Sequence, residues 1–582
     1  MDNEDNLIYP IDLSIFKDQT RQSLLNILDK LPKVEKTLII DKILISKLQY
    51  LTSLGTLKER QVRKESVILK STSFVSDSPI LIYIITPEIE NMKIIEKHIE
   101  NHAKDFGSKE SKEIEDKDSL NKYHLIFIPK ISGDCYSFIN NSKYKSYFNM
   151  HILSIDVYQL DYDLLSLENK DSFRDIYIDN NLNSLSLLSR AIIKYETVFG
   201  KIKNKYSKGV FAKKLIEILN REEEEYNNLN NENETLACFI FDRMVDMITP
   251  LCNNYVYEGL LDDFIGIDFN NVFVPTKILE KESKAEHLRI DLSENDKFYT
   301  SVKDYNFKKI KNFFPKRLAE LNTENLEKEK KAEKSSLTNH INISDYITKK
   351  HKIPIYKVYQ NFEYCLLRAE YPNKIFDFIE DEMGKKANEY NLLKIICLES
   401  IIHSGIKNKI YEQMKKDFLN TYGFKKLFLW HNLEKLEILK TQDSNNFYFE
   451  AKKGLQLIFD NVDINEPNDI SYVYNGYAPM IIRMVQKALC QGGWGAIRDV
   501  LRKIPGDTNF PTDESDLYNI SVDKQFILLV FIGGITYGEL AAIRLLNKKS
   551  RNKKFVILTT GMINSKKIFD SLKRGEFTLE KK

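Results

Sequence analysis

The sequence predicts an α/β protein with a large helical block between two regions that contain strands. Short apolar runs without polar alternation, such as Leu236–Phe241 and Gln525–Gly534, are typical of parallel strands that helices cover on both faces. Helical periodicity replaces such runs between residues 268 and about 470. The length of 582 residues is enough for about two to four domains.

Residues 1 to about 155 are expected to form a first α/β domain. Three apolar runs in this region have strand length: Thr37–Ile40, Pro79–Thr86 and Tyr123–Pro129. Helical stretches at Leu44–Leu54 and Glu90–Asn101 alternate with them, and this alternation indicates a parallel sheet. The charged segment Lys104–Asn121 is expected to be a solvated loop.

A second α/β unit is expected to start near His151–Val157. A helix is predicted over Leu182–Phe199, where apolar residues recur at helical spacing. Arg221–Glu234 is charged and rich in asparagine, and because it has almost nothing to bury we expect a loop. After the buried strand, Thr249-Pro250 is expected to interrupt regular secondary structure, since the residue before proline is disfavoured in the helical region. A short helix is then predicted over Tyr255–Phe264.

Three charged residues follow the buried strand: Asp242, Arg243 and Asp246. The two aspartates are candidate metal ligands or an acid pair. Alternatively, they pair with the arginine and hold the end of the strand against a neighbouring loop. The second arrangement is the more common one in proteins, so the residues favour a structural role.

Helical patterns dominate the block that follows. Asn295–Asn312 carries apolar residues at a spacing of three to four, and Leu337–Ile347 carries another apolar stripe. Asn391–Lys440 predicts two or three strong helices. Strand patterns return at Gln525–Gly534, and Phe555–Thr560 is predicted to be the last strand.

The composition excludes several classes of protein. A net charge of +2 argues against a nucleic-acid surface built on bulk charge. No run of about 18 apolar residues occurs, and the acidic start MDNEDNLIYPIDL is not a signal peptide. The six cysteines lack a C-x-x-C, which indicates reduced thiols and no zinc site. A cytoplasmic protein is therefore expected.

The feature most like a nucleotide site is Gly533-Gly534, which lies between a buried strand and a helix. Thr536 and Glu539 after it fit a capping box, which already satisfies the free amides, and the glutamate would repel a phosphate. No G-K-[ST] occurs, and Ser, His and Asp follow no recognisable catalytic order. We predict no enzyme activity, no cofactor and no metal, with a nucleotide-binding α/β protein as an alternative.

Several long motifs resemble one known family. They are HLIFIPK (His124–Lys130), DRMVDMITPL (Asp242–Leu251), YEGLLDDFIGI (Tyr257–Ile267) and DISYVYNGYAPMIIRMV (Asp469–Val485). The chain is identified by them as a member of the SM family, the SNARE-binding proteins that guide membrane fusion. The match runs nearly from end to end, and the residues of the motifs resemble those of a subfamily that acts in vacuolar protein sorting.

The resemblance implies a three-domain arch with two parallel-sheet α/β domains, the second of them discontinuous. The expected segments are domain 1 at residues 1–155, on the side of a SNARE-binding cleft, and domain 2 at 156–255 and 469–582. An inserted helical domain 3 at 256–468 is expected to carry the SNARE hairpin and the tether contact. In the family the signature is structural and not catalytic. That role is assigned here to Asp242, Arg243, Asp246, Thr249, Pro250, Glu258, Gly259, Gly533, Gly534, Thr536 and Glu539.

The resemblance also implies a function in membrane fusion. The protein would bind and template SNARE helices as a subunit of a HOPS or CORVET tether in endosome-to-lysosome or endosome-to-vacuole traffic. It would associate peripherally with late endosome and lysosome or vacuole membranes through its partners, and it would bind no nucleic acid. The alternative is a tether scaffold that has lost SNARE binding.

Two surfaces are the candidate binding sites. SNARE helices are expected at a helical hairpin within Asn339–Ala369, on four residues: Ile341, Ile343, Ile347 and Tyr359. The other interpretation makes these residues core, and the charged Asn322–Ser336 before them suggests a shortened hairpin. Docking of the tether subunit vacuolar protein sorting-associated protein 16 is expected at three residues, Lys440, an exposed Tyr448 and Ala451, with Phe449 as a substitute for the small alanine. The other interpretation of this segment is a polar loop.

Overall fold

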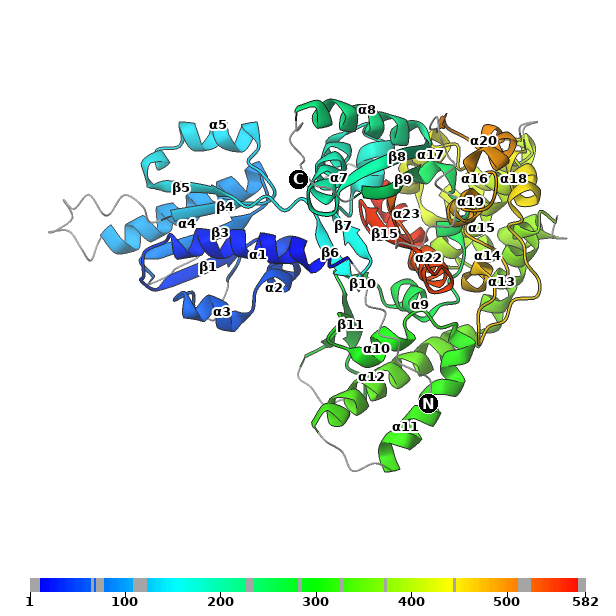
Figure 1. Cartoon of the computed structure of the whole chain (residues 1–582), viewed down its shortest axis with the longest axis horizontal. Helices are drawn as coiled ribbons and strands as arrows, with labels where there is room; N and C mark the ends of the chain where they lie inside the picture. The colour runs from blue at the N-terminus through cyan, green and yellow to red at the C-terminus, as the bar shows by residue number, and fades with distance from the viewer. Residues whose placement is uncertain are drawn as a thin grey trace. The chain divides into compact units, whose positions relative to one another are not determined.

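The computed structural model describes residues 11–63, 67–69, 78–107, 123–225, 234–280, 285–323, 328–370, 374–442, 446–510 and 525–573. The chain forms two compact units, Met1–Tyr162 and Asp163–Lys582. Each unit contains a sheet of mainly parallel strands with helices beside it (Figure 1). The four predicted domain segments stay a prediction.

The first unit is built on a five-stranded sheet in the order β2-β1-β3-β4-β5. Its strands are β1 (Lys36–Ile40), β2 (Val67–Ile68), β3 (Ile80–Ile85), β4 (Tyr123–Phe127) and β5 (Phe148–Ile152). Its helices are α1 (Ser14–Asp29), α2 (Ile45–Leu51), α3 (Leu54–Glu59), α4 (Ile89–Gly107) and α5 (Gly133–Asn141). Every pairing in the sheet is parallel, which confirms the parallel sheet predicted from the alternating pattern.

The burial of this sheet explains its sequence. Strands β3 and β4 are buried at every residue, so neither has a face exposed to solvent, and their residues are mainly apolar. Met92 and Ile95 of α4 join Leu81 and Tyr83 of β3 in one hydrophobic cluster. Among the described strands, β5 pairs only with β4 and forms the edge, and every side chain of β5 after Phe148 is partly or fully exposed. The short strand β6 (Tyr158–Asp161) ends the unit.

The second unit is built on a larger sheet with the order β13-β8-β9-β14-β15-β7. These strands are β7 (Leu164–Ser166), β8 (Lys201–Lys208), β9 (Glu234–Asp242), β13 (Thr508–Asn509), β14 (Gln525–Ile532) and β15 (Lys553–Thr559). All neighbours are parallel except the short β13, which runs antiparallel to β8. The central strands β9 and β14 pair along their length, with Ile240 opposite Val530, although the helical block separates them in the sequence.

The remaining helices of the sheet region are α6 (Ser172–Tyr177), α7 (Asn183–Phe199), α8 (Val210–Glu225), α19 (Met480–Ala488), α20 (Arg498–Lys503), α22 (Tyr537–Lys549) and α23 (Ser565–Lys573). The predicted helix over Leu182–Phe199 is confirmed as α7. Trp494, which precedes α20, is fully buried on this sheet, with its ring 5.4 Å from that of Phe239 and 5.9 Å from that of Tyr206.

The block between β9 and β14 is mainly helical, as predicted. Its helices are α9 (Tyr257–Phe264), α10 (Lys297–Val302), α11 (Phe307–Thr323), α12 (Lys328–His351), α13 (Pro354–Leu367), α14 (Ile375–Gly384), α15 (Glu389–Ile402), α16 (Asn408–Tyr422), α17 (Leu427–Lys435) and α18 (Phe447–Leu455). Figure 1 shows α11 and α12 side by side, away from the sheet of this unit. The segment predicted as two or three helices is α15, α16 and α17.

Three features differ from the sequence predictions. A small antiparallel sheet was missed, made of β10 (Ile267–Asp268), β11 (Asn271–Pro275) and β12 (His287–Asp291), because its strands are short and one is mostly exposed. The first residues of the segment predicted as a loop, Arg221–Glu225, extend α8, since glutamate is a good helix former. The rest of that loop, 226–233, and 108–121 of the predicted loop Lys104–Asn121 lie outside the described residues. Residues 104–107 belong to α4.

Candidate functional site

The charged signature after β9 is a buried ion-pair network. Nη1 of Arg243 donates to both carboxylate oxygens of Glu539 at 2.9 Å, and its Nη2 lies 3.6 Å from the carboxylate of Asp246. The side chains of all three residues are completely buried. Burial raises the pKa of the Glu539 carboxyl, against the opposing effect of the guanidinium. Among the described residues no group of His, Cys, Asp or Glu is arranged to hold a metal ion.

Asp242 closes the end of the same strand. Its carboxylate accepts hydrogen bonds from the Tyr177 hydroxyl at 2.6 Å, the Phe211 amide at 2.9 Å and the Met244 amide at 3.0 Å. A side chain at Gly209 would bring a Cβ within 2.1 Å of the Asp242 Cβ, so only glycine fits beside it. Asp242 therefore joins the strand end to α6 and α8.

Asp246 connects the signature to α19, which follows the helical block in the sequence. Its carboxylate accepts from the amide of Thr249 at 3.0 Å, from the hydroxyl of Thr249 at 2.6 Å and from the amide of Met480 at 3.1 Å. Pro250 occupies the first turn of a short 3-10 helix, Thr249–Leu251, where a missing amide hydrogen costs nothing. The predicted interruption at Thr249-Pro250 is thus a short 3-10 turn, which Asp246 holds through the amide and hydroxyl of Thr249.

Glu258 and Gly259 position α9. Glu258 accepts from Arg544 of α22 at 3.1 Å and from the hydroxyl of Tyr299 at 2.7 Å. Gly259 lies so close to Asn254 that a Cβ there would be 2.5 Å from the Asn254 Cγ. These contacts attach the start of the helical block to α22 of the sheet region.

The glycine pair after β14 forms a turn in which side chains of the protein itself bond to backbone amides. Gly533 and Gly534 have φ of 85° and 106°, in the left-handed region that favours glycine. The Gly533 amide donates to the Thr560 hydroxyl at 3.1 Å. Thr536 and Glu539 form the predicted capping box, which is confirmed. The helix start that would have held a phosphate is therefore occupied by threonine and a buried glutamate.

Helices α11 and α12 form a hairpin. Arg317 of α11 donates to Glu333 of α12 at 2.8 Å, and His340 of α12 is buried, with its ring nitrogen 2.7 Å from the hydroxyl of Tyr257. The hairpin was predicted at Asn339–Ala369, but it begins earlier in the chain. Helix α12 starts at Lys328, within the charged segment, and it packs against the preceding helix α11.

The predicted SNARE-binding residues on this part of the chain differ in exposure. Ile343 and Ile347 are 0% exposed, and Tyr359 on α13 is buried with its hydroxyl near Glu382. The interpretation of these three as surface residues is wrong, because they lie on the inward faces of their helices. Ile341 is partly exposed, and its contact with a partner stays a prediction.

The predicted tether-docking residues also divide between core and surface. Tyr448 is 0% exposed, and its hydroxyl donates to the carbonyl of Leu367 at 2.5 Å; Ala451 is 0% exposed as well. The expectation of an exposed tyrosine is therefore wrong. Tyr448, Ala451 and Leu455 recur at helical spacing and form the inward face of α18, a signal already present in the sequence. Phe449 is 52% exposed, and Lys440 is partly exposed.

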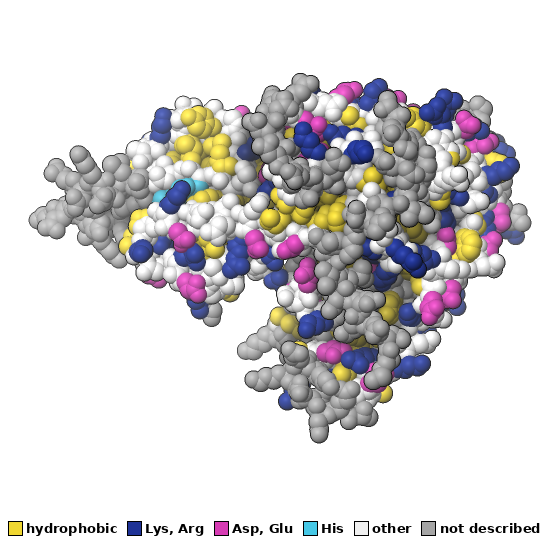
Figure 2. Space-filling view, viewed as in Figure 1, with side chains coloured by type: hydrophobic (Ala, Val, Ile, Leu, Met, Phe, Trp, Pro, Cys, Tyr) yellow, Lys and Arg dark blue, Asp and Glu magenta, His cyan; other side chains and the backbone are white. Residues whose placement is uncertain are grey.

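Further exposed apolar residues lie near α17 and in the first unit. Phe424, Leu427 and Phe428, at and before the start of α17, are exposed by 72%, 44% and 45%. In the first unit, exposed apolar side chains gather over α5 (Figure 2), and Met150 and Ile152 are exposed on the edge strand β5. Clustered apolar exposure is typical of protein-binding surfaces.

The Sec1 family model matches residues 36–571. The chain belongs to the Sec1 family. This Sec1-family chain is 27% identical to the vacuolar protein-sorting-associated protein 33 homolog of Arabidopsis thaliana, over 97% of both proteins. It is 26% identical to vacuolar protein sorting-associated protein 33A of Rattus norvegicus, over 97% of this chain and 98% of the relative.

Solved structures show the same fold. The SM protein Vps45 in complex with the Qa SNARE Tlg2 has a TM-score of 0.62 at 12% identity, over 97% of this chain and 98% of that one. The Unc18–syntaxin 1 complex from Monosiga brevicollis has a TM-score of 0.60 at 14% identity, over 97% and 99%. At such identities the likeness establishes the SM fold, as the sequence resemblance predicted.

Two further sequence expectations concern chemistry and membranes. All six cysteines are free thiols. Within the described part of the Sec1-family chain, no helix combines the length and the apolar character needed to cross a membrane.

Proposed function

We propose that this Sec1-family chain binds and templates SNARE helices during membrane docking and fusion in endosome-to-lysosome or endosome-to-vacuole traffic. The observation that carries the proposal is its likeness to vacuolar protein sorting-associated 33 proteins over 97% of the chain. Solved SM proteins of the same fold were captured with a Qa SNARE and with syntaxin 1. The proposed role is binding rather than catalysis, with attachment to endosomal and lysosomal or vacuolar membranes through partners.

The α11–α12 hairpin is the proposed SNARE surface. Arg317 and Glu333 join the two helices, and the buried His340 attaches α12 to α9. Its outer face combines charged side chains with the partly exposed Ile341, which suits an amphipathic SNARE helix with an apolar seam. A rigid surface that holds two helices in register reduces the conformational entropy that they lose on pairing.

The proposed tether contact lies on α18 and α17. We propose that Phe449, together with Lys440 and the exposed Phe424 and Phe428, docks the tether subunit vacuolar protein sorting-associated protein 16 in a HOPS or CORVET complex. An exposed phenylalanine beside fully buried neighbours is a suitable anchor, because it exposes much apolar area on a rigid helix.

Titration calorimetry of the whole chain against an assembled endosomal SNARE bundle tests the SNARE proposal, with and without the tether subunit. We expect saturable binding with a Kd on the order of 1 μM or tighter. Ile341→Asp is expected to weaken it, because a charge would lie under the apolar seam. Val210→Asp is the matched control, since Val210 is equally aliphatic and 50% exposed on α8.

Absence of binding in both conditions, while the tether subunit still docks, would contradict SNARE templating. That outcome would favour the alternative of a tether scaffold without SNARE binding. Equal weakening by Ile341→Asp and Val210→Asp would contradict the assignment to the hairpin alone.

A further inference from the structure

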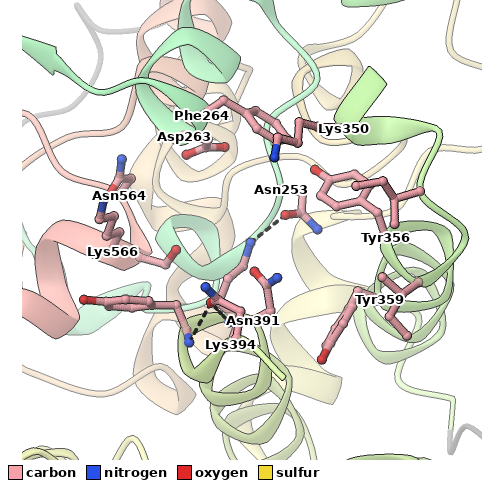
Figure 3. Close-up of a pocket in the computed structure, with 15 residues that line it drawn as sticks. Asn253, Asp263, Phe264, Lys350, Tyr356, Tyr359, Asn391, Lys394, Asn564 and Lys566 are labelled. Carbon is pink, nitrogen blue, oxygen red and sulfur yellow. Dashed lines mark hydrogen bonds between the residues drawn. The ribbon is translucent and has the colours of Figure 1, made fainter. Parts of the chain in front are cut away.

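A cavity of about 380 Å³ lies in the second unit, and no residue of α11 or α18 is among those that line it. Residues from α9, α12, α13, α15 and α23 line it (Figure 3). Its volume falls within the range typical of small-molecule sites. None of its functional groups belongs to the buried signature network described above, so the signature does not account for it.

Three lysines from three different helices line this cavity. Lys350 lies in the last turn of α12, Lys394 on α15 and Lys566 in the first turn of α23. Figure 3 shows Lys350 and Lys394 approaching Asn253 from opposite sides. Nζ of Lys394 donates to the Asn253 side-chain oxygen at 2.6 Å, which uses one of the three donors of the ammonium group.

Two carboxylates oppose this positive charge: Asp263 in the lining, and the buried Glu363, which accepts hydrogen bonds from the lining residue Asn253 and interacts with Lys394. Asp263 is the one carboxylate among the described residues that line the cavity. Burial raises the pKa of Asp263 to about 6, with Lys394 and a hydrogen bond from Asn254 acting in the opposite direction. Within the described part of the chain, neither Lys350 nor Lys566 forms an ion pair; Lys350 lies over the Tyr346 ring at 5.5 Å. The lining therefore has an excess of positive charge.

Helix starts add to that charge. The first residues of α13, α15 and α23 all contribute to the lining. The amino end of a helix carries a partial positive charge, and several such ends around one cavity favour an anion. Asn388 and Asn564 cap two of these starts with their own side chains, so we assign the direct contacts to the lysines.

The walls between the charges are aromatic. Tyr356 and Phe264 face the cavity (Figure 3), with their rings 5.9 Å apart. Tyr390 of α15 also lines it. Such walls suit the ring of a ligand, while ammonium groups suit phosphate oxygens.

We propose that this cavity binds a phosphorylated ring compound, with the phosphates held by Lys350, Lys394 and Lys566. A soluble sugar or cyclitol phosphate and the headgroup of a phosphorylated inositol lipid share this chemistry. Binding of either would give the protein a ligand site whose lining includes none of Ile341, Lys440 and Phe449, the residues proposed for SNARE and tether contacts.

The test uses the full chain and two probes. Inositol trisphosphate in titration calorimetry reports on a soluble ligand, and flotation with vesicles that contain phosphatidylinositol bisphosphate reports on a lipid headgroup. The variants are Lys350→Gln, Lys566→Gln and the pair together. Lys349→Gln is the matched control, because Lys349 is the exposed neighbour of Lys350 on α12 and does not line the cavity.

Saturable binding of at least one probe is expected, with affinity lost by about tenfold or more for each lysine removed and unchanged in Lys349→Gln. Binding of the soluble probe identifies a soluble ligand as sufficient, whereas binding to vesicles alone identifies the lipid. Lack of binding to both probes would overturn the proposal, as would equal losses in Lys349→Gln and the cavity variants. Thermal melting of each variant without ligand checks that the fold is retained.

Discussion

Arg243, after strand β9, and Glu539, in the first turn of α22, form a fully buried ion pair with a distance of 2.9 Å although 296 residues separate them in the sequence. The strand precedes the helical block and the helix follows it. The pair therefore fastens the two halves of the sheet region together at the point where the block begins. Asp246 extends the link to α19 through the amide of Met480.

The first prediction concerns this ion pair. Arg243→Met is expected to destabilise the chain by about 3–5 kcal/mol, because it leaves the Glu539 carboxylate buried without its partner. Urea unfolding followed by tryptophan fluorescence measures the change. Arg60→Met is the control, since its pair with Asp29 is partly exposed and is expected to contribute less than about 1 kcal/mol.

A double variant, Arg243→Met with Glu539→Gln, separates the pair from its surroundings. Its loss of stability is expected to be smaller than the sum of the two single losses, because the second change removes a charge that is already unpaired. Additive losses would mean that the two side chains act independently, contrary to the contact in the structure.

The second prediction concerns Gly259 of the signature. Gly259→Ala is expected to destabilise the chain by about 1–3 kcal/mol, since its Cβ would lie 2.5 Å from the Cγ of the buried Asn254. Gly384→Ala is the matched control: it lies at the end of α14 with nothing within 4 Å of the added Cβ. Chemical denaturation compares the two, and an equal effect at both positions would contradict the role of close packing.

The third prediction separates docking from folding on α18. Tyr448→Asp is expected to lower the melting temperature strongly, because it places a charge in the core and removes the hydrogen bond to Leu367. Phe449→Asp is expected to leave melting nearly unchanged and to weaken capture of vacuolar protein sorting-associated protein 16. Differential scanning fluorimetry and co-purification measure the two effects, and unaltered capture by a folded Phe449→Asp chain would refute the docking assignment.

The fourth prediction concerns pH. Burial raises the pKa of Glu363 from 4.5 to about 7, with Lys394 and the Asn253 amide opposing the shift. Between these two pH values the folded chain keeps a proton that the unfolded chain releases, so this residue makes stability fall as pH rises. Below about 4.5 the penalty is absent, and above about 7 it is complete.

Glu363→Gln removes that titration. Relative to the unaltered chain, the variant is expected to gain roughly 3 kcal/mol of stability between pH 4.5 and 7, at about 1.4 kcal/mol per pKa unit. The comparison uses the difference between the two proteins at each pH, because many other carboxyls titrate in both. A difference that stays constant across this range would contradict the raised pKa.

Local sequence patterns were sufficient for most of the elements. Apolar runs such as Leu236–Phe241 identified buried strands, because a strand covered on both faces has no position for a polar side chain. The capping box at Thr536 was also visible, since it depends on two residues three positions apart. The β10–β12 sheet was missed because its strands carry no clear local pattern. The pairing between the strands, which the sequence does not show, makes it a sheet.

The sequence by itself determined the family, the alternation of strands and helices, and the structural character of the Asp242–Pro250 signature. Only the tertiary structure decided which side chains are accessible: Tyr448 and Ile343 are core, whereas Phe449 is surface. The reason is that periodicity defines an apolar face, but packing against other elements decides whether that face is covered. The same holds for the cavity, whose three lysines come from helices far apart in the chain.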